Sequence, residues 1–397
     1  LGTVSSVLKS EGVVEGGTGA MSSGGKINKK KILIITNHSY MLYRFRKELI
    51  QKMLEDSEVV ISTPFVGHET DLKELGANCI KTEVDRRSIN PFTDLKLLRT
   101  YKTILKQEKP DLVITYSIKP NIYAGYLCGK MKIPFCANVQ GLGTAFQKAL
   151  LSNLVTVMYR TAFRKVETVF FENQENAQAF VRRRILPAKK EVVLSGAGIN
   201  LEEYRYRQYP DNEKVHFLYL GRIMKEKGMD ELFGAVEQLR KNGCEFILDL
   251  VGFFEDEYKK QVEQFQNEGV VRFYGFQENP KPYYAQTDCV VLPSYHEGMS
   301  NVLLEAAASG RAIITTDIPG CREAVDNGKS GMLCKVKSTD SLYKAMKRFT
   351  ELSREKRELL GKAGREKMER EFDKKKVVEE TVKVITKAMT KQERGMK

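Results

Sequence analysis

Two glutamates separated by seven residues, Glu297 and Glu305, mark the most distinctive segment of the chain. The segment 294–305 follows an apolar run typical of a buried strand and opens a predicted helix. Ser300 or Asn301 can cap that helix, and its remaining N–H groups, together with the helix dipole, can bind a phosphate. Glu305 is then placed to accept hydrogen bonds from a ribose diol, and Glu297 from the hydroxyls of a sugar. The pattern favours a site for a phosphorylated ligand rich in hydroxyl groups.

Two solvated carboxylates on a helix surface are the simpler interpretation of the same spacing. The residues around Glu305 argue against it, because Leu303, Leu304 and the alanines at 306–308 make the helix largely apolar. A carboxylate on such a helix is nearly buried and needs polar partners. Gly298, at the start of the segment, lets a ligand approach the backbone closely. We therefore expect Glu305 to lie in a binding site.

The loop 220–228 supplies the opposite charge through Arg222 and Lys227. The guanidinium fork and the ammonium point charge both suit a diphosphate. As a nucleoside diphosphate leaves, negative charge grows on its bridging oxygen, and two fixed cations stabilise that transition state more than the ground state. A basic surface turn is the simpler interpretation of this loop alone. Beside the glutamate pair, the two cations are the better candidates for accelerating bond cleavage, and the glutamates for positioning the donor.

Alternating strands and helices must position these groups. Apolar runs predict strands at 31–36, 59–63, 112–116, 133–138, 168–171, 191–194, 215–220, 246–251, 271–273, 289–292 and 312–316, with helices between them. This alternation predicts an α/β protein with two facing Rossmann-like domains, each built on a doubly wound parallel sheet, and a cleft between them. Ligand loops in such sheets follow the carboxyl ends of the strands, so the cleft suits two substrates, one for each domain.

The domain organisation follows from breaks in this alternation. We expect a disordered leader or an expression remnant over 1–27, an acceptor-binding domain over 28–199, a linker over 200–213, a nucleotide-sugar-binding domain over 214–375 and a C-terminal helix over 376–397. A return of that last helix to the N-terminal domain is left open. The length of 397 residues agrees with two domains of similar size.

The two charged segments resemble the hallmark motifs of retaining GT-B glycosyltransferases of family 4. Glu297 and Glu305 match the E-x7-E motif, and Gly221, Arg222, Lys227 and Gly228 match the basic loop. The resemblance implies a metal-independent hexosyltransferase without a cofactor that retains anomeric configuration. It implies catalytic roles for Arg222, Lys227 and Glu297, and donor binding by Gly221, Gly252, Phe276, Gly298, Met299, Ser300, Asn301 and Glu305. The sequence itself shows no D-x-D metal motif on a strand end.

The N-terminal half looks most like enzymes of bacterial capsule, O-antigen and lipid-linked oligosaccharide assembly that add N-acetylgalactosamine or a related hexose. This resemblance implies a UDP-sugar donor and a polyprenyl-diphosphate-sugar acceptor. The expected acceptor-binding residues are His38, Arg86, Arg87, Lys119 and Gly141. Many family members place a histidine in the segment corresponding to 138–143, which has none here, so no catalytic base is assigned. In a front-face mechanism the leaving phosphate takes the acceptor proton, and no base is needed.

The net charge of +14 indicates an anionic partner. The predicted helix 145–165 has an apolar face, and basic residues cluster at its ends and at 182–184 and 189–190, which fits a helix lying on an anionic membrane surface. Packing of the helix in the domain core is an equal alternative. Seven cysteines without a C-x-x-C pair favour reduced thiols. We therefore expect a cytoplasmic enzyme, peripheral on the inner face of the cell membrane.

Other functions stay open at this level. A nucleotide-sugar epimerase of GT-B fold and a glycosyltransferase with a soluble acceptor are both compatible with two Rossmann-like halves. A nucleic-acid-binding protein is disfavoured, because its charge would form an ordered stripe interleaved with stacking aromatics. The basic residues instead gather around one helix and the phosphate loop, so we expect no nucleic-acid partner.

Overall fold

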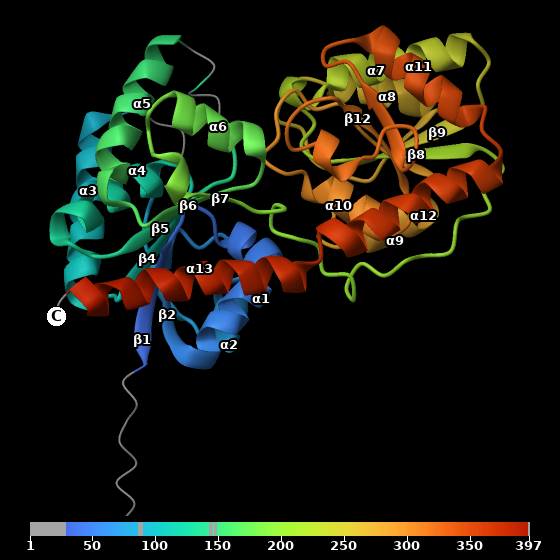
Figure 1. Cartoon of the computed structure of the whole chain (residues 1–397). Coiled ribbons are helices and arrows are strands. Elements are labelled where there is room, and N and C mark those ends of the chain that lie inside the picture. The colour runs from blue at the N-terminus through green and yellow to red at the C-terminus, as the bar shows by residue number, and fades with distance from the viewer. Residues whose placement is uncertain (1–28, 86–89, 143–145, 147–148, 396–397) are drawn as a thin grey trace, which may run out of the picture.

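A computed structural model describes residues 29–85, 90–142, 146 and 149–395 and shows two α/β domains side by side (Figure 1). The N-terminal domain has a parallel sheet of seven strands in the order β3-β2-β1-β4-β5-β6-β7. These are β1 (Lys30–Ile35), β2 (Ser57–Thr63), β3 (Asn78–Lys81), β4 (Leu112–Tyr116), β5 (Phe135–Val139), β6 (Thr168–Phe171) and β7 (Glu191–Val193). The central strands are continuous apolar runs because helices cover both faces of the sheet.

Two separate cores show which helices cover each face. On one face lie α1 (Ser39–Asp56), α2 (Glu69–Glu74) and α13 (Lys374–Gly395). On the other lie α3 (Pro91–Glu108), α4 (Ile118–Met131), α5 (Ala149–Ala162) and α6 (Gln174–Arg182). The chain order reverses between β1 and β4, where a doubly wound sheet opens a crevice at its carboxyl edge.

The C-terminal domain repeats this plan with six parallel strands in the order β10-β9-β8-β11-β12-β13. The strands are β8 (Val215–Leu220), β9 (Phe246–Val251), β10 (Val271–Phe273), β11 (Cys289–Leu292), β12 (Ala312–Thr316) and β13 (Gly331–Cys334). The helices are α7 (Met229–Lys241), α8 (Lys259–Asn267), α9 (Lys281–Gln286), α10 (Asn301–Ala308), α11 (Thr339–Thr350) and α12 (Arg354–Glu371). The motif loops 221–228 and 293–300 therefore follow the neighbouring strands β8 and β11 at one edge of this sheet.

The chain crosses between the domains twice, and the two crossings touch. Ile199 and Asp373 form a parallel β-bridge, and a β-carbon on Gly198 would lie 2.8 Å from Lys374 Cα. Beyond the second crossing, α13 runs back along the N-terminal domain and packs against α1 (Figure 1).

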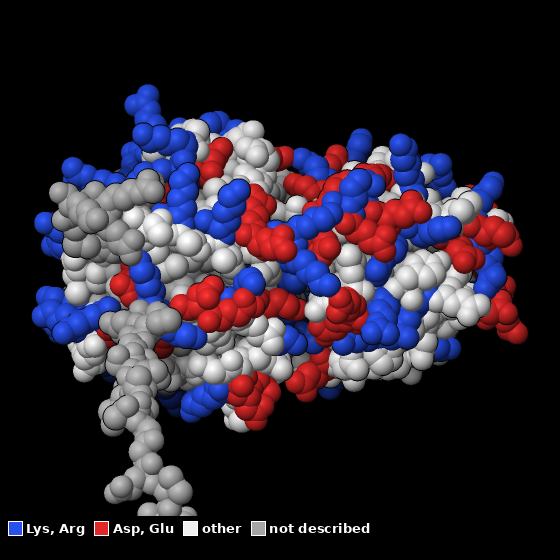
Figure 2. Space-filling view, turned by 60° about the horizontal axis from the view of Figure 1, so that its bottom comes forward, with Lys and Arg blue, Asp and Glu red and all other residues white. Residues whose placement is uncertain are grey.

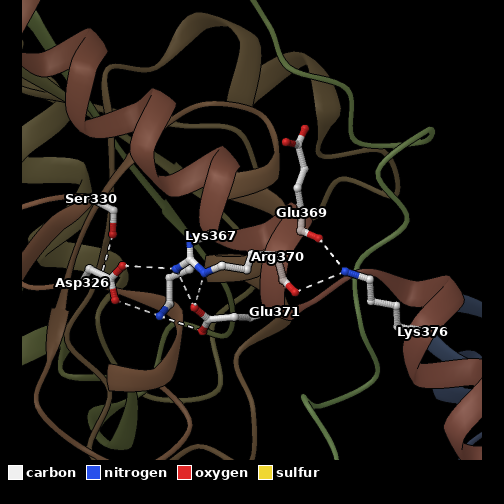
Figure 3. Close-up of polar contacts among 7 residues, drawn as sticks. All are labelled: Asp326, Ser330, Lys367, Glu369, Arg370, Glu371 and Lys376. Carbon is white, nitrogen blue, oxygen red and sulfur yellow. Dashed lines mark hydrogen bonds and ion pairs between the residues drawn. The ribbon is translucent and has the colours of Figure 1, made fainter.

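The end of α12 is anchored to its own domain by a charged cluster (Figure 3). Lys367 Nζ lies 2.8 Å from Asp326 Oδ1 and 3.0 Å from Glu371 Oε2. Lys376, at the start of α13, donates to the carbonyls of Glu369 and Arg370, which end α12 without intrahelical partners. The position at which the chain leaves the C-terminal domain is therefore held by several contacts.

The segment 200–213, predicted as a linker from its polarity, lies against the C-terminal domain. Tyr204 and Tyr209 in it are buried. The fully buried guanidinium of Arg311 donates to the carbonyls of Arg207 and Gln208. One buried cation thus satisfies several carbonyls that have no strand or helix partner.

The predicted strands and helices agree with the structure to within a few residues, with two exceptions. The first exception is that the predicted strands do not include the edge strands β3 and β13. Each has only four residues, and the side chains of β3 are partly buried or exposed, so neither strand shows a long apolar run in the sequence. Helix α5 covers 149–162 and a 3-10 turn follows at 163–165, whereas the expected beginning of this helix lies outside the described residues. The leader expected at 1–27 also lies outside them.

Candidate active site

Lys227 and Glu297 meet between the loops that follow β8 and β11. Lys227 Nζ donates to Glu297 Oε1 at 2.5 Å, and Ser294 Oγ donates to the same oxygen at 2.8 Å. Both charged side chains are largely shielded, with exposed fractions of 18% and 13%. The tertiary structure therefore brings together one predicted cation and one predicted carboxylate of the donor site, 70 residues apart in the sequence.

Arg222 lies in a different arrangement. Its Nη1 contacts Glu255 Oε2 at 2.9 Å, and 45% of its side chain is exposed. Tyr219 donates its hydroxyl to the carbonyl oxygen of Arg222, which holds the backbone of the loop while the side chain stays at the surface. Arg222 and Lys227 thus belong to one loop, and their side chains pair with different carboxylates.

Close backbone contacts explain two glycines of the predicted site. A β-carbon on Gly252 would lie 1.8 Å from the carbonyl oxygen of Gly221, so the turns after β8 and β9 could not pack together with a larger residue there. A β-carbon on Gly298 would lie 1.6 Å from the carbonyl oxygen of Gln140 in the N-terminal domain. Gly141 lies beside this contact, 3.7 Å from Gly298 Cα when given a β-carbon.

Glu305 is buried, as predicted from its apolar neighbours, with 5% of the residue exposed. Tyr284 on α9 donates to its Oε2 at 2.8 Å, and Arg44 Nη2 on α1 lies 4.0 Å from its Oε1. Burial raises the pKa of the Glu305 carboxyl, and the positive charge of Arg44 opposes that rise. The carboxylate is thus contacted by residues of both domains.

The predicted cap of α10 is only partly right. Ser300 occupies the N-cap position, but its side chain makes no capping hydrogen bond. Its backbone N–H instead donates to the carbonyl of Gly320, in the turn after β12, at 2.9 Å. Asn301 is the first residue of the helix, and Met299 is buried with its side chain against Gly196 at the domain crossing.

The N-terminal domain contributes residues that sequence analysis missed. Asn173 Nδ2 donates to the carbonyl of Gly298 at 2.7 Å across the domain boundary. The neighbouring Glu172 forms an ion pair of 2.8 Å with Arg46 and accepts a hydrogen bond from the backbone of Met299. Burial raises the pKa of the Glu172 carboxyl, and Arg46 opposes the rise. Their position at the carboxyl end of β6 was the available signal, since such ends carry ligand loops.

Three of the predicted acceptor residues, His38, Lys119 and Gly141, are described, and each follows a strand at the carboxyl edge of the N-terminal sheet. His38 is the N-cap residue of α1, with its ring 6.1 Å from that of Tyr40. Lys119 lies in the first turn of α4 and forms an ion pair of 2.8 Å with Asp94. Arg86 and Arg87 lie outside the described residues.

Two exposed aromatic rings lie near the loop 221–228, where the Ile223 N–H donates to the carbonyl of Phe253. Phe276 is 58% exposed and Phe253 is 44% exposed, and their rings lie 6.2 Å apart in an edge-to-face arrangement. They follow β10 and β9, on the side of the sheet away from β12. Exposed aromatic faces of this kind can stack on a planar base.

A cavity of about 140 Å³ lies between the domains near Glu305. Arg44 and Glu48 of α1, Glu203 and Tyr204 of the crossing segment, and Lys374 line it together with Glu305. Burial lowers the pKa of Lys374 to about 8. In the described part of the chain, no group of three or more histidine, cysteine, aspartate or glutamate side chains is arranged to hold a metal ion. Within the same residues, no helix has both the length and the apolar character to cross a bilayer.

Two family descriptions match the chain. Residues 202–367 match "Glycosyl transferases group 1", and residues 31–173 match "Glycosyl transferase 4-like". Together they include every strand of the two parallel sheets except β7 and the first residue of β1.

Individual proteins are similar over most of the chain. An N,N'-diacetylbacillosaminyl-diphospho-undecaprenol alpha-1,3-N-acetylgalactosaminyltransferase of Campylobacter jejuni is 30% identical over 79% of this chain and 87% of its own length. The capsular polysaccharide biosynthesis glycosyltransferase CapM of Staphylococcus aureus is 24% identical over 88% of this chain and 94% of its own. Among solved structures, Anabaena HepE in complex with UDP and glucose superposes with a TM-score of 0.73, at 15% identity, over 90% of this chain and all of that one.

Proposed function

The chain belongs to the group 1, 4-like glycosyltransferases of GT-B fold, and from this premise we propose that it moves a hexose or N-acetylhexosamine from a UDP-sugar to a polyprenyl-diphosphate-linked saccharide. The reaction would retain anomeric configuration and serve bacterial surface polysaccharide or glycan assembly. Support for the acceptor comes from the Campylobacter relative, which is named for a diphospho-undecaprenol substrate, and support for UDP from the HepE complex.

The contact between Lys227 and Glu297 is the observation that carries the proposal. The pair joins a shielded cation and a carboxylate in the loops before α7 and α10. A sugar diphosphate bound there would use the cation for its phosphates and the carboxylate for its hydroxyls. We assign Lys227 and Arg222 to the leaving diphosphate, Glu297 to the hydroxyls of the donor sugar and Glu305 to the ribose. Arg222 is 45% exposed, so its side chain has the freedom to leave Glu255 for a phosphate.

The remaining donor contacts follow from the same placement. We assign Gly298, Met299, Ser300 and Asn301, at the start of α10, to donor binding, and the tight turns at Gly221 and Gly252 to the path of the diphosphate. Phe276, joined by Phe253, would stack on the base.

The proposed transfer step uses the donor, the acceptor and the two cations Lys227 and Arg222. The bond from the anomeric carbon to the diphosphate oxygen breaks, and a bond from the same carbon to the acceptor oxygen forms on the same face. The acceptor proton passes to the leaving phosphate oxygen, whose growing charge Lys227 and Arg222 stabilise. His38, Lys119 and Gly141, with Arg86 and Arg87, would border the acceptor.

A membrane surface is the place to meet a polyprenyl acceptor, and α5 has features that suit it. Val155 and Tyr159 pack in the core, whereas Leu154 and Val157 are 53% and 55% exposed. The helix thus has a core face and an exposed apolar face. Arg164, Lys165, Arg182 and Arg184 are exposed close by in the chain. We propose that this surface, the α5 surface, holds the enzyme on the cytoplasmic side of the cell membrane.

The distribution of charge on the surface argues against a nucleic acid as a partner. On the face of the molecule drawn in Figure 2, basic and acidic side chains are interspersed over both domains. A nucleic-acid-binding face would instead gather basic residues into a continuous track.

The proposed reaction is tested with a panel of nucleotide sugars and polyprenyl-diphosphate-sugar acceptors, with products identified by mass spectrometry. Transfer from a UDP-sugar to the lipid-linked saccharide is expected. Isomerised donor without transfer would favour a nucleotide-sugar epimerase, and transfer only to water-soluble saccharides would favour a soluble acceptor. Glu305→Ala should weaken binding of UDP-sugar while the fold persists.

A further inference from the structure

The guanidinium of Arg44 reaches from α1, in the N-terminal domain, to three parts of the chain beyond the first domain crossing. Arg44 Nη2 donates to the hydroxyl of Tyr204 at 3.2 Å, and Nη1 to the carbonyl of Glu278 at 3.4 Å. Nη2 also lies 4.0 Å from Glu305 Oε1. The side chain is 19% exposed, and the contacts with Tyr204 and Glu305 are partly buried, whereas the contact with Glu278 lies at the surface.

The carboxylate of Glu305 is held by a short chain of polar groups that begins at Arg44. Tyr204 accepts from Arg44 and itself hydrogen-bonds Glu305, while Tyr284 donates to Glu305 Oε2. An ionised carboxylate has about four positions for accepting hydrogen bonds. Two tyrosine hydroxyls use two of them, which leaves two for the two hydroxyls of a ribose.

We propose that Arg44 is a positioning residue for the donor, which fixes the Glu305 carboxylate beside Tyr204 and Tyr284 in the orientation that accepts the ribose diol. The inference rests on the proposed function, because it takes Glu305 as the ribose-binding group. Arg44 acts through Glu305 and Tyr204 rather than on the reacting atoms.

The proposal makes the donor site depend on both domains. Glu305 and Tyr284 belong to the C-terminal domain, whereas Arg44 belongs to α1. A carboxylate buried without a positive neighbour tends to take up a proton and then accepts hydrogen bonds less well. The nucleoside part of the site is therefore complete only when α1 is in contact with the C-terminal domain.

The test compares the affinity of the full chain for UDP, measured by isothermal titration calorimetry, in variants of α1. Arg44→Met should weaken binding by about ten-fold or more, the scale of one lost contact to a charged group. Arg44→Lys keeps the charge and should restore part of the affinity. Lys52→Met is the matched control, since Lys52 is a cation of the same helix that pairs with Glu55 at the surface.

A pH profile distinguishes positioning of Glu305 from a general effect on structure. The charge of Arg44 lowers the pKa of Glu305, so its removal raises that pKa further. UDP binding by Arg44→Met should therefore be lost at a higher pH than binding by the unaltered chain as the solution is acidified, and Arg44→Lys should resemble the unaltered chain. The titratable or charged groups around Glu305 lie on five parts of the chain: Tyr40, Tyr43, Arg44, Lys47 and Glu48 on α1, Glu203 and Tyr204 in the crossing segment, Glu278 after β10, Tyr284 on α9, and Lys374 on α13. Measurements kept well below the pKa of Lys374, about 8, leave that lysine charged throughout.

Each outcome has a separate meaning. If Glu305→Gln weakens UDP binding while Arg44→Met binds as well as or better than the unaltered chain, the role of Arg44 is wrong and the proposed site stands. If Glu305→Gln binds UDP unchanged, or the unaltered chain does not bind UDP, the ribose assignment and the inference both fail. Tyr204→Phe, which removes the hydroxyl between Arg44 and Glu305, replaces Arg44→Met if that variant does not fold, and should likewise weaken binding.

Discussion

The carbonyl oxygen of Gln140 lies 1.6 Å from the position that a β-carbon on Gly298 would occupy. Gln140 follows β5 in the N-terminal domain, and Gly298 precedes α10 in the C-terminal domain. The carbonyl oxygen belongs to the backbone and a β-carbon is bonded directly to it, so neither atom could rotate away to relieve the clash as the end of a flexible side chain would. The two domains therefore meet at this point only if residue 298 is glycine.

Gly298→Ala should lower kcat/KM for transfer by at least ten-fold, because the donor loop and the N-terminal domain cannot both keep their places. Steady-state kinetics with the lipid-linked acceptor measures the loss. Gly129→Ala, on α4 of the N-terminal domain, is the control, since its β-carbon would have only an ordinary contact of 3.7 Å, to Lys165 Cβ. Equal activity of the two variants would mean that this domain contact is not needed for transfer.

Lys227→Met should lower kcat by about a hundred-fold or more and change the affinity for UDP-sugar less, because its charge matters most as the diphosphate leaves. Lys225→Met, in the same turn, is the control, since that side chain is 69% exposed and pairs with Asp230 at the surface. A Lys227→Met enzyme with normal kcat would exclude the lysine from the transition state.

Removal of the exposed apolar side chains of α5 should weaken attachment to anionic vesicles. Leu154→Asp combined with Val157→Asp is expected to reduce sedimentation of the protein with phosphatidylglycerol vesicles. Added salt should reduce sedimentation of the unaltered chain, since each basic residue near the membrane surface contributes about 1 kcal/mol to binding. Leu359→Asp is the matched control, because Leu359 is 63% exposed on α12 of the other domain. Binding unaffected by the α5 changes would show that another surface meets the membrane.

Lys374 should make the free energy of unfolding rise with pH in the alkaline range. Burial lowers its pKa from 10.5 to about 8 in the folded chain. Below pH 8 both states hold the proton and the folded state bears the cost of the buried charge. Between about pH 8 and pH 10.5 the folded state has released the proton and the unfolded state still binds it. The free energy of unfolding therefore increases by about 3 kcal/mol over this range.

Lys374→Met has no proton to release, so its denaturant-unfolding curves should lack this rise, while all other titrations stay common to both proteins. Parallel plots of unfolding free energy against pH for the two chains would show that the lysine is not buried in a low-dielectric site.

Sequence patterns alone determined the two parallel sheets, the loops with Glu297, Glu305, Arg222 and Lys227, and the burial of Glu305. These depend on apolar runs, helix periodicity and motif spacing, which are local properties. The tertiary structure decided which charges meet. Lys227 pairs with Glu297, whereas Arg222 from the same loop pairs with Glu255. Arg44 reaches Glu305 from the other domain, because strand order and domain packing bring together residues that no local pattern relates.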